Sequence, residues 1–106
     1  MAEADRRAAE RIPVSAGTNC EFVARVVEDI GPVKIRDVSM QGIGLVLMKS
    51  VPVGTVLSIG LSNPNKGFFK VLMVQVAHVT ATHGGFLVGG SFTDPLTYQE
   101  FTTLVM

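Results

Sequence analysis

Residues 68–92 read FFKVLMVQVAHVTATHGGFLVGGSF, and this stretch favours two long β-strands joined by a short turn. Valine, phenylalanine and threonine, which strands prefer, recur in Phe68–Thr82 and again in Phe86–Phe92. The His83-Gly84-Gly85 segment between them is a turn signal. Because the first strand is unusually long, we expect a bend or a bulge midway. We also expect Phe68 and Phe69 to belong to the strand and the core.

Four further runs upstream have the same character, and Gly, Pro, Asn and Asp separate them. They predict strands at Cys20–Glu28, Val33–Asp37, Gly42–Met48 and Thr55–Leu61. Leu57, Ile59 and Leu61 alternate with small or polar residues and should face the core. Six strands at this spacing predict an all-β fold, either an antiparallel barrel or a sandwich. A closed barrel would remove the exposed edges of such apolar strands.

The pattern changes after Asp94-Pro95, where apolar residues follow one another at helical spacing. We therefore expect a short C-terminal helix. Thr93 or Asp94 could cap it, with Pro95 in its first turn.

The first eleven residues differ from the rest, because they are polar and rich in alanine and charge. An isolated helix of this length is marginal in water, and Pro13 disfavours helical angles at Ile12. We expect residues 1–11 to form a flexible N-terminal arm and residues 12–106 to form the folded domain.

Composition limits the classes of function that this domain could have. The 106 residues suit one domain, and the net charge of zero argues against a nucleic-acid polymer as partner. Cys20 is the single cysteine, so it can form neither an internal disulfide nor a CxxC metal site. No signal peptide is evident, and the apolar stretch around Val71–Val79 is too short to span a bilayer. We expect a cytoplasmic protein that does not insert into a membrane.

Three arginines, Arg6, Arg7 and Arg11, are clustered in the arm, and the last two form an RxxxR motif. A guanidinium group pairs with two phosphate oxygens, or with O6 and N7 of guanine, and its plane stacks on a base. Taken alone, the motif could equally be a solvated basic arm without a ligand.

A second cluster, Asp37-Val38-Ser39-Met40-Gln41-Gly42, has the spacing DxSxxG at the junction of two predicted strands. The Asp37 carboxylate could accept hydrogen bonds from N1 and N2 of guanine, and the Ser39 hydroxyl could add another. Gly42 permits either a positive φ or the close approach of a ligand to the backbone. Taken alone, the cluster could be an ordinary turn stabilised by Asp37 and Ser39.

The RxxxR motif followed by DxSxxG in a short β-rich chain resembles the PilZ domain family. The tail from Gly85 to Phe92, followed by Pro95 and a helix, is similar to the end of that family's fold. The resemblance implies a six-stranded antiparallel β-barrel with a short C-terminal helix. It also implies a receptor for cyclic di-GMP, with no cofactor and no catalytic activity.

The resemblance assigns roles to the matching residues. Arg7 and Arg11 would grip phosphates and guanine faces, while Arg6, just before the motif, has a less defined role. Asp37, Ser39 and Gly42 would form the second half of the site on the barrel surface. Gly89-Gly90 departs from the family, many members of which carry a bulkier or polar residue near the ligand.

The predicted function is a cyclic di-GMP receptor that changes conformation on binding and signals to a downstream protein partner. A nucleotide-independent protein-interaction adaptor of the same fold remains an alternative. A barrel that binds single-stranded nucleic acid is a third, disfavoured by the zero net charge and the absence of tryptophan. His78 and His83 lack neighbouring cysteines or carboxylates at metal-ligand spacing, and no catalytic constellation points to an enzyme.

Overall fold

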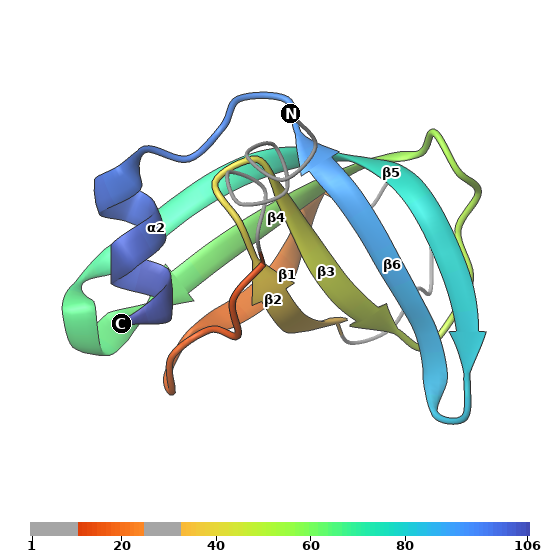
Figure 1. Cartoon of the computed structure of the whole chain (residues 1–106), viewed down its shortest axis with the longest axis horizontal. Coiled ribbons are helices and arrows are strands. Elements are labelled where there is room, and N and C mark those ends of the chain that lie inside the picture. The colour runs from red at the N-terminus through yellow and green to blue at the C-terminus, as the bar shows by residue number, and fades with distance from the viewer. Residues whose placement is uncertain (1–10, 25–32) are drawn as a thin grey trace, which may run out of the picture.

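The structure is a computed structural model that describes residues 11–24 and 33–106. Six strands form one sheet in the order β1-β4-β5-β6-β3-β2, and a helix follows the last strand (Figure 1). The strands are β1 (Asn19–Ala24), β2 (Val33–Val38), β3 (Gly42–Leu47), β4 (Val56–Asn63), β5 (Phe68–Thr82) and β6 (Gly85–Phe92), and helix α2 spans Tyr98–Val105. The predicted strands agree to within two residues, except that 25–28, assigned to the first of them, lie outside the described residues.

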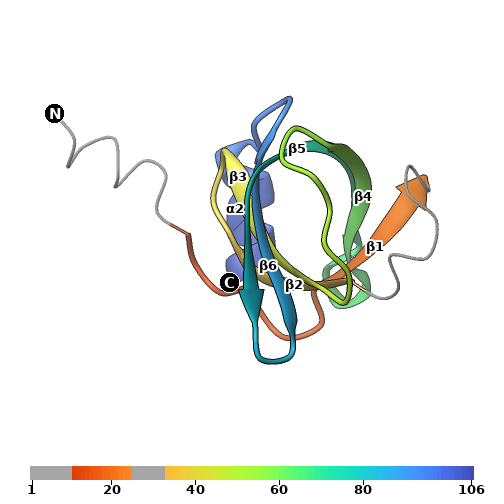
Figure 2. The same cartoon turned by 90° about the vertical axis from the view of Figure 1, so that its right-hand side faces the viewer.

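The sheet curls into a nearly closed barrel. All five strand pairs are antiparallel, and the two edge strands, β1 and β2, come close to each other. Figure 2 shows the strands curving around a common centre. The prediction of a six-stranded antiparallel β-barrel is therefore confirmed, and the sandwich alternative is wrong.

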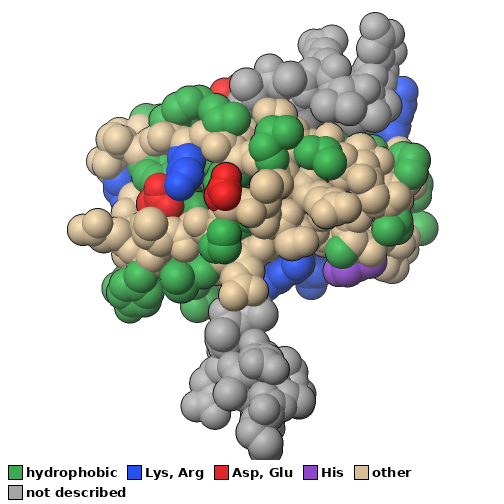
Figure 3. Space-filling view, turned by 90° about the horizontal axis from the view of Figure 1, so that it is seen from above, with side chains coloured by type: hydrophobic (Ala, Val, Ile, Leu, Met, Phe, Trp, Pro, Cys, Tyr) green, Lys and Arg blue, Asp and Glu red, His purple; other side chains and the backbone are tan. Residues whose placement is uncertain are grey.

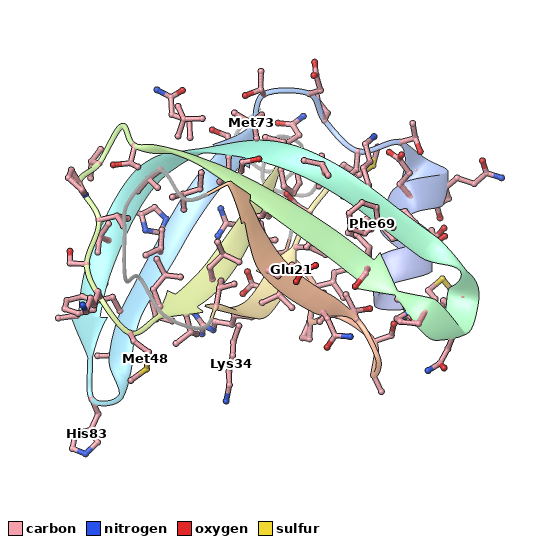
Figure 4. All side chains as sticks on the ribbon, turned by 180° about the vertical axis from the view of Figure 1, so that it is seen from behind. Glu21, Lys34, Met48, Phe69, Met73 and His83 are labelled. Carbon is pink, nitrogen blue, oxygen red and sulfur yellow. The ribbon has the colours of Figure 1, made fainter. Side chains whose placement is uncertain are left out.

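The core lies inside the barrel, where alternate residues of the strands meet. Leu57, Ile59 and Leu61 of β4 are at most 1% exposed, as their alternation predicted. Burying each such side chain contributes about 1.5–3 kcal/mol of transfer free energy. Phe69 departs from the prediction, because it lies on the outer face of β5 and is 61% exposed (Figure 4). Phe68, its neighbour, is partly buried and packs against the core.

Strand β5 is the long strand that the sequence predicted, and it carries the expected irregularity. Its register against β6 shifts between Val76 and His78. A bulge inserts one extra residue, which bends the strand and increases its twist. This bend allows a fifteen-residue strand to follow the curved barrel wall.

Helix α2 begins three or four residues later than the predicted caps, Asp94 or Thr93, would place it. Thr97 caps it and forms a reciprocal capping box with Glu100, so the prediction of Thr93 or Asp94 as the cap is wrong. Leu96, which is 2% exposed, donates its backbone N–H to the carbonyl of Met40 at 2.7 Å. This bond and the burial of Leu96 keep the chain out of a helix until Thr97.

The C-terminal end of α2 fixes the segment that leads into β1. The Leu104 carbonyl accepts hydrogen bonds from the Ser15 backbone N–H at 2.8 Å, the Ser15 hydroxyl at 3.0 Å and the Thr18 hydroxyl at 3.2 Å. Lys66 donates to the Thr103 carbonyl at 2.8 Å. These donors satisfy carbonyls that a helix end leaves without partners. The helix thereby fixes the course of the chain between Arg11 and β1.

Candidate ligand-binding site

The chain after Arg11 is attached to the end of β2 by a pair of backbone hydrogen bonds. The Ile12 N–H donates to the Val38 carbonyl at 2.8 Å, and the Val38 N–H donates to the Ile12 carbonyl at 2.9 Å. Arg11 precedes Ile12, and Asp37 precedes Val38. This bridge brings the last arginine of the RxxxR motif beside the first residue of DxSxxG.

The side chains of Arg11 and Asp37 face each other at this point. Arg11 Nη1 lies 3.8 Å from Asp37 Oδ1, and the two side chains are 32% and 20% exposed. Arg36 Nε lies 3.9 Å from Asp37 Oδ2, with a more exposed side chain. The sequence interpretation did not include Arg36, although its position next to the DxSxxG aspartate was a usable signal. The site therefore holds two guanidinium groups around one carboxylate.

One oxygen of that carboxylate, Asp37 Oδ1, is buried and has no hydrogen-bond partner among the described residues. The 3.8 Å to Arg11 exceeds hydrogen-bond length. Buried polar atoms in folded proteins are nearly always hydrogen-bonded, and leaving one unpaired costs about 1–3 kcal/mol. Asp37 Oδ1 is therefore an acceptor suited to a donor from a ligand.

Ser39 shapes the turn between β2 and β3. Its hydroxyl oxygen accepts from the backbone N–H of Gly42 at 3.0 Å and of Gln41 at 3.2 Å, and it is 2% exposed. The Gln41 carbonyl in turn accepts from the Phe92 N–H at 2.8 Å, which fastens the turn to β6. These bonds fix the corner that presents Asp37. The predicted contact between Ser39 and a ligand stays a prediction.

Gly42 and Gly44 lie where neighbouring groups leave no room for a side chain. A β-carbon at Gly42 would collide with the Gly90 carbonyl oxygen and would lie 3.4 Å from Arg11 Nη2. At Gly44 it would collide with the Asp37 carboxylate and lie 3.3 Å from Arg11 Nη1. Gly42 is not among the glycines with positive φ, so that explanation of the motif glycine is wrong. Close packing of strand β6 explains it instead.

Four of the six predicted site residues are therefore gathered at one corner of the barrel: Arg11, Asp37, Ser39 and Gly42. The other two, Arg6 and Arg7, lie outside the described residues, as does the predicted flexible arm apart from Arg11.

A family model described as the PilZ domain matches residues 5–105. The chain belongs to the PilZ domain family. PilZ domains are a family of cyclic di-GMP-binding receptor domains rather than catalysts. The searches of curated proteins and of solved structures returned no match. Membership therefore rests on a match across nearly the whole chain, in agreement with the resemblance carried by the two motifs.

Three further features of the described parts of this PilZ domain concern its single thiol, its metal-ligating side chains and the length of its helix. Burial raises the pKa of the Cys20 thiol to about 12, and the Glu21 carboxylate adds to the rise, so the thiol stays protonated at neutral pH. Residues 11–24 and 33–106 contain no group of three or more His, Cys, Asp or Glu side chains that could hold a metal ion. Within the same ranges, no helix has the length and apolar character needed to cross a membrane.

Proposed function

We propose that this PilZ domain is a cyclic di-GMP receptor whose site lies between the arginine-bearing arm and the corner joining β2 to β3. The observation that carries the proposal is the arrangement at that corner, where Arg11 faces Asp37 and Asp37 Oδ1 is buried without a partner in the described structure. The carboxylate would accept from the N1 and N2 donors of guanine, and Arg11 would bind a phosphate or the guanine face.

Arg6 and Arg7 enter the proposal through chain length. Arg7 precedes Arg11 by four residues, so its Cα can lie at most about 14 Å from that of Arg11. This span is comparable with the size of the ligand, which carries two phosphates and two guanines. The three arginines could then contact separate groups of one ligand while Asp37 holds a guanine. Ser39 and Gly42 would contribute to the wall of the site at the turn.

Binding would order residues 1–11 against the barrel of residues 12–106. The charge-assisted hydrogen bonds must exceed the entropy lost on ordering the arm. The ordered arm would present a changed surface to a downstream protein partner. The proposal includes a cytoplasmic location, which suits a chain with a single cysteine.

A calorimetric titration of the chain with cyclic di-GMP tests this function. We expect saturable binding that weakens several-fold between about 50 mM and about 500 mM NaCl, because salt screens exposed phosphate contacts. Cyclic di-AMP should bind about tenfold more weakly or worse, because adenine lacks the N1–H donor and the N2 amino group that Asp37 would accept from. No heat and no thermal stabilisation with cyclic di-GMP would instead favour the nucleotide-independent adaptor.

A further inference from the structure

Two glycines, Gly44 and Gly89, lie side by side on the outer face of the barrel next to Asp37. Gly44 of β3 is paired with Asp37 on one side and with Gly89 of β6 on the other. Gly89 is paired in turn with His78 of β5. Paired residues of neighbouring strands share a face of the sheet, so Asp37, Gly44, Gly89 and His78 form one row across four strands. We call this the glycine row.

The side chains of Asp37 and His78, at the two ends of the glycine row, extend over the glycines between them. The Asp37 carboxylate occupies the position that a β-carbon on Gly44 would take. The His78 imidazole does the same over Gly89, where Nε2 and Cε1 are the nearest atoms and Cδ2 lies 3.1 Å from the β-carbon position. Directly opposed residues have Cα atoms about 4.5–5.5 Å apart. The imidazole and the carboxylate therefore lie over two adjacent glycines, Gly89 and Gly44.

Bulges support this arrangement on both flanking strands. The register of β2 shifts between Ile35 and Asp37, and that of β5 shifts between Val76 and His78. Each end residue of the glycine row thus follows directly after an irregularity. Bulges commonly re-aim side chains next to binding sites.

Among the described residues, the charged side chains that strand pairing brings to the glycine row are those of the site already described. Along the row they are Asp37 and, above it, Arg11. The loop 51–55, which contacts β5 through the Val76 backbone, contains no titratable side chain. Within the described structure, His78 has neither an ion pair nor a side-chain hydrogen bond. In the view of Figure 3, Lys and Arg side chains lie at several separate places on the surface, among hydrophobic and uncharged groups.

We propose that His78 is a further ligand-binding residue of this site and that its protonated imidazole binds a phosphate of the nucleotide. The inference rests on the proposed function. The His78 imidazole would form the side of the site opposite Asp37. Gly89 has no side chain, so the imidazole can lie over strand β6 at this position. An imidazolium placed against a doubly charged ligand is stabilised by it. Ligand binding is then accompanied by proton uptake, and affinity rises as the pH falls through the range in which histidine titrates.

The experiment is the same calorimetric titration at about pH 6 and about pH 8, repeated in buffers of different ionisation enthalpy to count protons. We expect binding roughly three- to tenfold tighter at the lower pH, with net proton uptake. H78Q should abolish both effects. His83→Gln is the matched control and should keep them, because His83 lies at the tip of the β5–β6 hairpin, pointing away from the barrel (Figure 4).

A second variant keeps the positive charge at both pH values. His78→Lys should bind at about pH 8 as tightly as the wild type does at about pH 6, with no proton uptake. Binding by the wild type without pH dependence, or equal pH dependence in His78→Gln, would overturn the role of His78 while leaving the cyclic di-GMP site intact. If cyclic di-GMP bound at neither pH, both the cyclic di-GMP site and the role of His78 would be overturned.

Discussion

Asp37→Asn is expected to weaken the binding of cyclic di-GMP by about 10- to 150-fold. The carboxylate can accept from two guanine donors at once, whereas asparagine offers one acceptor and turns an N–H₂ donor toward the ligand. A hydrogen bond to a charged group is worth about 1.5–3 kcal/mol, which corresponds to this range. The substitution conserves size, so the packing of the carboxylate over Gly44 should persist.

Calorimetry measures this loss, and thermal unfolding without ligand checks that the fold is intact. Asp94→Asn is the matched control, since it makes the same chemical change at an exposed residue after β6 and should leave affinity unchanged. Equal affinities for the wild type and Asp37→Asn would remove Asp37 from the site. An equal loss in Asp94→Asn would show that net charge, rather than the position of the carboxylate, governs binding.

Leu104→Ala is expected to lower the free energy of unfolding by about 2–5 kcal/mol. Leu104 is fully buried at the end of α2, and its truncation would leave a cavity where the helix meets the core. Such a loss is a large fraction of the 5–15 kcal/mol that stabilises a typical domain of about this size. Urea unfolding followed by circular dichroism measures the change.

The comparison for this variant is Met106→Ala, at an 82% exposed position directly after the same helix. That substitution should change stability by about 0.5 kcal/mol or less. If Leu104→Ala were equally mild, α2 would not be part of the core. The backbone carbonyl of residue 104 remains in the variant, so the bonds from Ser15 and Thr18 are not themselves deleted.

The barrel could be predicted from the sequence because its inward and outward residues alternate cleanly. The β4 triplet Leu57, Ile59 and Leu61 shows this, since each residue is buried as expected. Phe69 was misjudged because a single exposed aromatic residue has the same local pattern as a buried one. The start of α2 was misplaced because Asp94-Pro95 also resembles a helix start, although Thr97 and Glu100 carried a capping-box signal.

The site could be predicted only in part. Motif spacing identified Arg11 and Asp37, and it could also have drawn attention to Arg36. It could not reveal His78, our proposed further ligand, which is forty-one residues beyond Asp37 in the chain and is brought to the same row by the register of β2, β3, β6 and β5. That register depends on two bulges, and bulges shift pairing without a clear signature in the sequence.

Amide NMR spectra recorded during a titration with cyclic di-GMP test most directly whether a nucleotide binds at the barrel corner where Arg11 meets Asp37. We predict that the largest shifts map to Arg11–Ile12, to residues 37–44 and to Gly89. Shifts confined to β1 and β4, or spectra unchanged by saturating ligand, would contradict the account.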